Sequence, residues 1–210
     1  EFRRVLFRSA LNSPHWPIVP APEWVGKSGL GQYGDFVMAT DAALGQVMEA
    51  VEKAGIAKNT LLIFTSDNGC APDAGTDALE KQGHYASGIL RGYKSDIWDG
   101  GHRIPFIAQW PGKIAPGTKS DRLTCLSDLL ATCAAIVDTK LPANVGEDSV
   151  NMLPALLGNE TDSLREAIVH HSADGSFSIR QGKWKLELCP GSGGWGKPGN
   201  FDARSEEHTS

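Results

Sequence analysis

The clearest pattern of apolar and polar positions lies at residues 61–69, which read Leu-Leu-Ile-Phe-Thr-Ser-Asp-Asn-Gly. Four consecutive apolar residues are typical of a short strand that is covered on both faces, as in a parallel α/β sheet. This strand would be followed at once by Asp67 and Asn68. Because open α/β sheets place their sites outside the carboxyl ends of strands, we expect these two side chains to lie at a functional edge.

A long helix is predicted from Tyr33 to about Ala54, because apolar side chains recur there at spacings of three and four residues. Gly55 stands where helices commonly end, and Lys53 suits the negative end of the helix dipole. The acidic residues fall outside the apolar stripe and are interpreted as a solvated face. The stripe consists of Phe36, Val37, Leu44, Val47, Met48 and Val51.

The middle of the chain shows one further strand and two further helices. Residues 104–110 form a second apolar run that ends at a Pro-Gly pair. Residues 126–137 predict a strongly apolar helix with Ser127 or Asp128 as its N-cap, and residues 148–157 predict a shorter helix. The stretch between the two strands lacks periodicity from Gly69 to Gly88 and is interpreted as a loop, which at such a length is more often functional than idle.

The end of the chain has the pattern of short strands, at residues 167–171, 176–180 and 183–188. The last two are joined tightly through a Gln-Gly pair. A hairpin-rich tail after an α/β body predicts a small antiparallel subdomain that begins near residue 160. The expected fold class is therefore α/β with a mainly parallel sheet, followed by this subdomain.

The two ends of the chain carry related heptapeptides. Residues 3–9 can be encoded by a DNA string whose reverse complement translates as residues 204–210. Natural termini would hardly share this relation by chance, so we interpret residues 1–9 and 204–210 as non-native, adapter-like tails. On this interpretation the α/β part spans residues 10–159 and the small α+β subdomain spans residues 160–203.

Composition argues against several classes of protein. The formal net charge is −5, and no basic stripe indicates a nucleic-acid partner. No apolar run approaches the roughly 18 residues of a membrane span. The four cysteines have no Cys-x-x-Cys spacing and do not indicate a zinc site, while a disulfide between Cys70 and Cys189 stays open.

The candidate site residues each have two interpretations when they are taken singly. Asp67 and Asn68 offer the hard oxygen donors that Ca²⁺ or Mg²⁺ prefers, but Asp-Asn-Gly is also an ordinary turn sequence because Asn and Gly tolerate positive φ. His15 lies in a Pro-rich extended segment, where a histidine is usually just exposed. Lys94 lies in a stretch dense in charged and glycine residues, and taken alone it would be interpreted as a solvated surface lysine.

Taken together and in order, these motifs resemble the sulfatases, specifically the arylsulfatase-type branch of the alkaline-phosphatase-like superfamily. The resemblance covers nearly all of residues 11–198 and corresponds to the C-terminal portion of such an enzyme. Members mostly carry Glu where this chain has Asp99. The matching stretches are His15 in a His-x-Pro sequence, residues 65–69, residues 88–94 with Lys94, the Gly-Gly-x-Arg-x-Pro run with its flanks at residues 98–112, and residues 180–186.

The resemblance implies part of an alkaline-phosphatase-like sandwich and a calcium-dependent hydrolase of sulfuric esters. Asp67 and Asn68 would be two of the ligands of one Ca²⁺ ion. Lys94 would stabilise negative charge at the sulfate or the leaving oxygen, and His15 could protonate that oxygen. The substrate would be a small-molecule or glycan sulfate ester, and the intact protein is expected to be periplasmic or secreted.

One part of the family's machinery is missing from this sequence. The nucleophile of sulfatases is a formylglycine made from Cys or Ser in a Cys/Ser-x-Pro/Ala-x-Arg motif, and Cys70, the nearest match, has Ala74 where Arg is needed. We therefore expect the nucleophile and the remaining calcium ligands upstream, and this chain by itself to be inactive. Two alternatives stay open: a metal-dependent phosphomonoester or phosphonate hydrolase of the same superfamily, and a carbohydrate-binding relative without a nucleophile.

Overall fold

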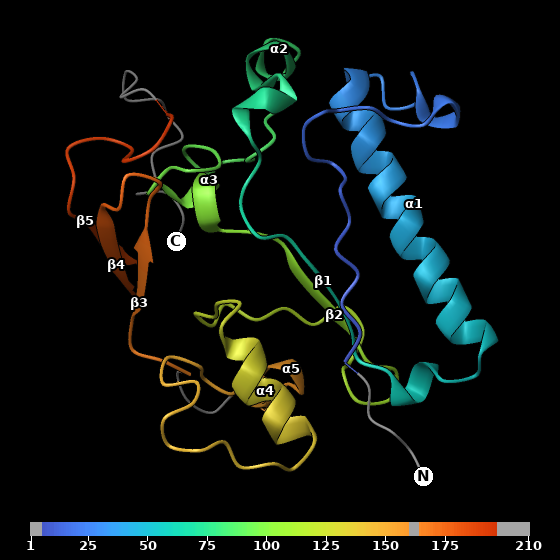
Figure 1. Ribbon diagram of the computed structural model, residues 1–210, viewed down its shortest axis with the longest axis vertical. Coiled ribbons are helices and arrows are strands. Elements are labelled where there is room, and N and C mark those ends of the chain that lie inside the picture. Colours follow the sequence, from blue (N-terminus) through green and yellow to red (C-terminus); the bar gives the residue numbers. More distant parts are fainter. Residues whose placement is uncertain (1–5, 160–163, 197–210) are drawn as a thin grey trace.

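The computed structural model describes residues 6–159 and 164–196 and shows a mixed α/β arrangement (Figure 1). Helix α1 runs along one side, a three-stranded sheet lies on the other, and the pair β1–β2 lies between them. The helices are α1 (Gly31–Lys53), α2 (Thr76–Lys81), α3 (Asp99–His102), α4 (Asp128–Ile136) and α5 (Leu153–Leu156). The strands are β1 (Leu62–Thr65), β2 (Phe106–Gln109), β3 (Ile168–His171), β4 (Phe177–Gln181) and β5 (Trp184–Glu187).

Helix α1 confirms the long helix expected from the apolar spacing. Its start is fixed by the buried carboxylate of Asp35, which accepts hydrogen bonds from the backbone N–H groups of Gly26 (2.7 Å) and Ser28 (2.8 Å) in the preceding turn. Its end is followed by Gly55 at φ +69°. The apolar stripe is largely uncovered, since Val47 is 44 % exposed, so the amphipathic pattern predicted the helix but not what its apolar face contacts.

Strands β1 and β2 form a pair that departs from the parallel sheet expected for this part of the chain. They are antiparallel, with Leu62 opposite Gln109 and Thr65 opposite Phe106. Strand β1 is half-buried throughout, and β2 alternates between half-buried and exposed positions, as a strand covered on one face does. The α/β class stands, but β1 is not covered on both faces by the residues that the structure describes.

Three short elements correct the expected loop and helix boundaries. The predicted loop at 69–88 contains α2, because Asp77 to Lys81 are mostly good helix formers and Leu79 is buried. A helix of one or two turns is too short to show a repeat of apolar positions in the sequence, and α3 was not predicted for the same reason. The helix expected at 148–157 is reduced to α5, because the backbone N–H groups of Val150 and Met152 donate to the side chains of Asp128 and Thr132 in α4 instead.

The C-terminal strands confirm the predicted antiparallel sheet, in the order β3-β4-β5. Ile168 pairs with Arg180, and Gln181 pairs with Trp184 across a turn where Gly182 has φ +55°. The boundary proposed near residue 160 and the tail at 204–210 lie outside the described residues, so the domain limits stay predictions. No helix in the described ranges has both the length and the apolar character needed to cross a membrane.

Buried positions gather around α3 rather than under α1. Ile97 is fully buried and Trp98 nearly so, with the guanidinium of Arg91 stacked 3.7 Å from the centre of the Trp98 ring. Asp96 and Asp99, on either side of these two residues, are buried as well. This segment immediately follows Lys94, so the best-packed part of the chain adjoins one of the predicted site residues.

Candidate active site

The structure brings together two site residues that lie 79 positions apart in the sequence. Lys94 Nζ lies 3.3 Å from Nε2 of His15. The other ring nitrogen of His15, Nδ1, lies 2.7 Å from the carbonyl oxygen of Trp16. Because a carbonyl can only accept, Nδ1 carries the hydrogen in the neutral ring, and Nε2 is left to accept from the ammonium group of Lys94. His15 is exposed and Lys94 half-buried, so the pair is open to a substrate.

The backbone of Lys94 is tied to the loop that follows β1. Its N–H donates to the carbonyl oxygen of Cys70 over 2.8 Å. In the same loop the Ser66 hydroxyl donates to the carbonyl oxygen of Asn68 over 2.8 Å, which fixes the turn. The predicted lysine and the predicted metal ligands therefore belong to one connected region of the structure.

Asp67 and Asn68 have the donor chemistry of half a calcium site. The amide nitrogen of Asn68 donates to the carbonyl oxygen of Gly69 over 2.9 Å, which leaves its side-chain oxygen as an acceptor. The carboxylate of Asp67 is exposed. Two oxygen donors suit Ca²⁺ but fall short of the six to eight it takes, and no group of three or more His, Cys, Asp or Glu side chains gathers around a possible ion within residues 6–159 and 164–196.

A buried ion cluster beside this region was not predicted from the sequence. Asp99, the first residue of α3, is 1 % exposed and pairs with Arg180 of β4 and with Lys185 of β5, whose Nζ lies 2.9 Å from Asp99 Oδ1. Burial alone would raise the pKa of Asp99, but hydrogen bonds from His102 and Arg180 and the charge of Lys185 outweigh it and hold that pKa well below its usual range. Asp99 is therefore ionised at neutral pH.

Two histidines complete the cluster. His102 of α3 and His170 of β3 are stacked with ring centres 4.0 Å apart. Burial, together with the nearby positive charges, lowers the pKa of His170 to about 3, so this ring is neutral at physiological pH. The Arg-x-Gly-x-Trp-Lys spacing at residues 180–185 was the available signal in the sequence for the cationic partners in this cluster.

The four cysteines are free thiols, so the disulfide left open between Cys70 and Cys189 is not formed. Burial raises the pKa of the Cys70 thiol, and only a hydrogen bond with Tyr33 works against that rise. A thiol with a raised pKa is a poor nucleophile at neutral pH. This agrees with the sequence argument that Cys70 does not fit the family's nucleophile motif.

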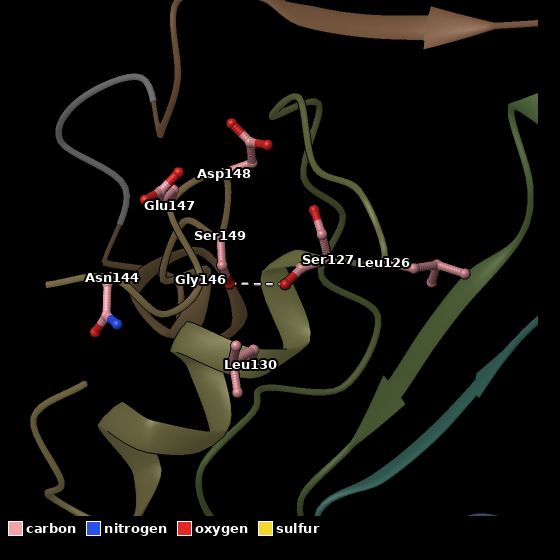
Figure 2. Close-up of a pocket in the computed structure, with 8 residues that line it drawn as sticks. All are labelled: Leu126, Ser127, Leu130, Asn144, Gly146, Glu147, Asp148 and Ser149. Atoms are coloured by element: carbon pink, nitrogen blue, oxygen red, sulfur yellow. Dashed lines mark hydrogen bonds between the residues drawn. The ribbon is translucent and has the colours of Figure 1, made fainter. Parts of the chain in front are cut away.

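A wide, open hollow lies elsewhere, beside the start of α4, and contains none of the predicted site residues (Figure 2). Its volume is about 630 Å³. The hydrogen bond from Ser149 to the carbonyl oxygen of Ser127 (2.7 Å) ties together its two sides. Its lining consists of Leu126, Ser127, Leu130, Asn144, Gly146, Glu147, Asp148 and Ser149.

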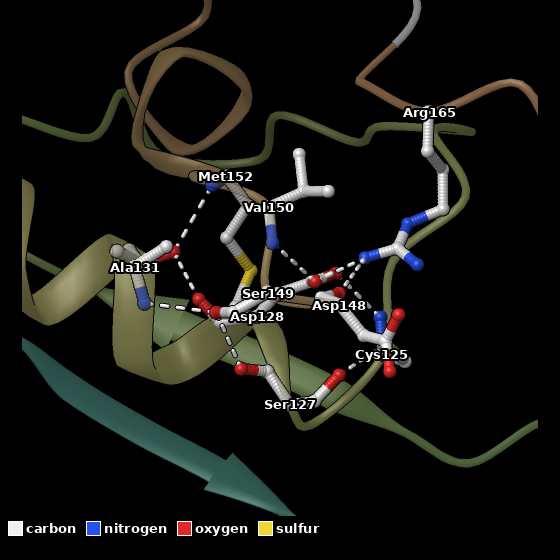
Figure 3. A network of polar contacts seen from close by, with 10 residues as sticks. Cys125, Ser127, Asp128, Ala131, Asp148, Ser149, Val150, Met152 and Arg165 are labelled. Carbon is white, nitrogen blue, oxygen red and sulfur yellow. Dashed lines mark hydrogen bonds and ion pairs between the residues drawn. The ribbon is translucent and has the colours of Figure 1, made fainter. Parts of the chain in front are cut away.

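Behind this hollow a second buried aspartate, Asp128, organises the polar network of Figure 3. Asp128 is 1 % exposed and accepts hydrogen bonds from the backbone N–H groups of Cys125 (2.8 Å) and Val150 (2.9 Å). Arg165 pairs with the same carboxylate. These contacts bind the loop before α5 to the first turn of α4, and their role is structural.

Comparison with known proteins places these residues in a family. The family model Sulfatase matches residues 5–139. An N-acetylgalactosamine-6-O-sulfatase of Bacteroides thetaiotaomicron is 40 % identical over 174 residues, which are 81 % of this chain and 34 % of that protein. Arylsulfatase A of Bos taurus is 38 % identical over 184 residues, covering 85 % of this chain and 34 % of its own length.

The solved structures agree with this result. A structure from work on the metabolism of multiple glycosaminoglycans by Bacteroides thetaiotaomicron matches with a TM-score of 0.77 and 37 % identity, covering 84 % of this chain and 37 % of that one. The chain belongs to the sulfatase family, and the alkaline-phosphatase-like α/β class is confirmed. It spans about a third of the length of the curated relatives that it matches.

Proposed function

We propose that the full-length protein containing this chain hydrolyses sulfate esters, and that this chain supplies the leaving-group side of its active site. The observation that carries the proposal is the His15–Lys94 pair, with Nζ and Nε2 3.3 Å apart, on a loop bonded to the Asp67–Asn68 turn. A cation, an imidazole and two oxygen ligands for a metal ion in one connected region suit the negative charge that develops on the oxygens during S–O cleavage.

Lys94 supplies a fixed positive charge where the bond breaks. Cleavage of a sulfate ester moves negative charge onto the leaving oxygen and the non-bridging oxygens. An ammonium group held in place before the reaction stabilises that charge without reorganisation, which is often the largest catalytic effect. The half-buried position of Lys94 and the bond from its N–H to Cys70 provide this fixed placement.

His15 acts as the proton donor to the leaving oxygen. The ring is oriented by the contact between Nδ1 and the Trp16 carbonyl oxygen, so Nε2 faces Lys94 and the space in front of it. To act as the donor, the ring must carry hydrogens on both nitrogens; Nε2 then gives its proton to the leaving oxygen, and the ring returns to the neutral form with its hydrogen on Nδ1. This assignment makes His15 and Lys94 a pair that acts on the same oxygen.

Asp67 and Asn68 would hold a calcium ion through the carboxylate and the amide oxygen. When bound, such an ion supplies Lewis-acid polarisation of the sulfate oxygens. The remaining ligands and the formylglycine nucleophile would come from sequence outside this chain, and this chain alone would then be inactive. The relatives named above favour sulfated sugars or aryl sulfates as substrates, and a periplasmic or extracellular location.

The test uses the full-length protein with 4-nitrophenyl sulfate, 6-sulfated N-acetylgalactosamine and 4-nitrophenyl phosphate as separate substrates. Lys94→Met should lower kcat for the sulfates by about 100- to 1000-fold, whereas Lys81→Met, an exposed lysine on α2, should leave it unchanged. Preference for the phosphate ester would overturn the proposal in favour of a phosphomonoesterase. Absence of any turnover with calcium present would favour a binding relative.

The metal assignment has its own test in the same protein. Asp67→Ala should abolish calcium-dependent activity and weaken calcium binding, measured by calorimetry, by more than about 100-fold. Asp77→Ala removes an exposed carboxylate on α2 and should change neither. Calcium binding that survives Asp67→Ala unchanged would remove Asp67 from the ligand set.

A further inference from the structure

The backbone just after Lys94 is held by residues almost a hundred positions away. Ser95 has φ +83°, a left-handed conformation that side chains other than glycine rarely adopt. Its carbonyl oxygen accepts a hydrogen bond from the N–H of Ala173 (3.0 Å), and its hydroxyl accepts one from the N–H of Trp195 (2.9 Å). This strained residue is thus fixed from outside its own loop, by the C-terminal segment, residues 172–196.

The next two residues are held by the same segment. The carboxylate of Asp96 accepts a hydrogen bond from the N–H of Gly196 over 2.7 Å, and the N–H of Ile97 donates to the carbonyl oxygen of Ser192 over 2.6 Å. Asp96 and Ile97 are both buried. The stretch that leaves Lys94 therefore has its polar groups satisfied chiefly by the C-terminal segment.

The β4–β5 hairpin adds charge to this attachment. Lys185 Nζ contacts Asp99 Oδ1 at 2.9 Å and also donates to the carbonyl oxygen of Ile97, while Arg180 pairs with Asp99 Oδ2. Asp99 and the Lys185 side chain are 1 % and 5 % exposed. Both cations are thus committed to fixing the start of α3.

Helix α3 in turn touches both halves of the candidate site. The N–H of Gly69, next to Asn68, donates to the carbonyl oxygen of Gly101 over 2.9 Å. A Cβ on Gly69 would lie 1.8 Å from the Gly100 carbonyl oxygen, and a Cβ on Gly100 would lie 2.0 Å from that of Gly92. The short helix is therefore wedged by backbone contact between the Asp67–Asn68 turn and the loop that carries Lys94.

We propose that Asp99 and Lys185 are positioning residues for the sulfatase reaction, and that the C-terminal sheet sets the placement of Lys94 through α3. Neither side chain needs to touch substrate. The hairpin holds Asp99, Asp99 holds α3, and α3 holds the two loops at the separation that the reaction requires. This inference rests on the proposed function for its catalytic part, but the mechanical part concerns the fold alone.

The variants are Lys185→Met, which keeps the length of the side chain without its charge, and Asp99→Asn, which keeps its shape. Lys183→Met is the matched control, because Lys183 lies on the same hairpin but is exposed, over the Trp184 ring. Circular dichroism and thermal melting of the full-length protein establish the folded fraction of each variant. If one of the two variants does not fold, the other is used alone for the measurements below.

The first readout is hydrogen–deuterium exchange of peptides spanning residues 67–70 and 91–97. Exchange in both peptides should rise at least about 10-fold in Lys185→Met and Asp99→Asn, while exchange in α1 stays at the wild-type rate. The double variant should show less than the sum of the two single effects, because both changes break the shared contact between Lys185 and Asp99. Wild-type exchange in both peptides would overturn the inference whether or not the protein is a sulfatase.

The second readout is the dependence of the rate on the leaving group. A misplaced Lys94–His15 pair costs most where the leaving oxygen needs help, so kcat should fall about 10- to 100-fold for a sugar 6-sulfate and clearly less for 4-nitrophenyl sulfate, with KM nearly unchanged. A lower folded fraction would reduce both rates equally, and that outcome would overturn the positioning role. A wild-type protein with no sulfatase activity would instead refute the proposed function and leave the exchange result to decide the inference.

Discussion

Two buried aspartates, Asp99 and Asp128, solve the same local problem in different ways. Each is the first residue of a helix, each is 1 % exposed, and each pairs with an arginine far downstream, Arg180 or Arg165. Asp128 also accepts hydrogen bonds from two backbone N–H groups, within the network at the start of α4 that Figure 3 shows. Asp99 instead gathers side chains that carry or can carry positive charge.

The difference shows how much of each cluster serves stability and how much serves placement. Two neutral N–H donors satisfy part of Asp128, so that its cluster contains, among the residues that the structure describes, a single cation, Arg165. Asp99 is surrounded by Arg180, Lys185 and His102. If its charge is lost, the largely buried cations Arg180 and Lys185 lose the carboxylate that compensates for their desolvation. The Asp128 cluster joins the loop before α5 to α4, whereas the Asp99 cluster joins the C-terminal sheet to α3, beside the loops of the candidate site.

The largest effect on stability is expected from Asp128→Ala. The change leaves Arg165 and the N–H groups of Cys125 and Val150 without their acceptor, and breaking a buried pair in this way typically costs about 3–5 kcal/mol. Urea denaturation of the full-length protein measures the loss. Asp121→Ala, at an exposed position, should stay within about 0.5 kcal/mol of wild type, and an equally small effect for Asp128→Ala would contradict the stabilising role given to the Asp128 cluster.

A second contrast compares Gly100, the residue after Asp99, with Gly45 in α1. Gly100→Ala places a Cβ 2.0 Å from the Gly92 carbonyl oxygen and should destabilise the protein by about 1–3 kcal/mol. Gly45→Ala in α1 has open space around the new carbon and should stabilise by about 0.5–1 kcal/mol, because alanine is the better helix former. Opposite shifts in melting temperature are the expected result, and a neutral Gly100→Ala would contradict the wedge.

The Asp99 cluster should also make the free energy of unfolding depend on pH, through His170. The pKa of His170, beside Asp99, is lowered by burial from 6.5 to about 3, so the unfolded chain binds this proton more readily. Stability should therefore fall as pH drops from about 6.5 towards 3, with a slope below about 1.4 kcal/mol per pH unit. His170→Gln should flatten this limb in urea titrations between pH 4 and 7. A parallel acid limb in that variant would exclude His170 as its source.

The smallest effect provides the baseline for buried ion pairs. Glu49 and Lys53 form an exposed pair on α1, with oxygen and nitrogen 2.6 Å apart. Solvent screens such a pair, so Lys53→Ala should cost no more than about 0.5 kcal/mol, and 1 M salt should remove most of that difference. A loss as large as that of Asp128→Ala would mean that burial is not the cause of the large effect expected at Asp128.

The sequence predicted those parts of the molecule whose signals are local. Helix α1 and the C-terminal strands follow from apolar spacing, whereas the roles of His15, Lys94 and Asp67 rest on ordered motifs and stay predictions. Asp99 could not be recognised as the centre of a cluster, because Arg180 and Lys185 lie 81 and 86 residues away. Likewise, four apolar residues in β1 do not encode the direction of a partner strand, which depends on contacts formed only after the chain returns.

The left-handed Ser95 has a consequence for how the protein is made. Its hydroxyl partner, Trp195, lies 100 residues later, and a ribosome adding roughly 5–20 residues per second needs about 5–20 s to reach it. During that time His15 and Lys94 have already been synthesised, but the hydrogen bonds of residues 95–97 with Ala173, Ser192, Trp195 and Gly196 cannot yet form. The candidate site is therefore completed late, only after the nascent polypeptide has extended through residues 172–196.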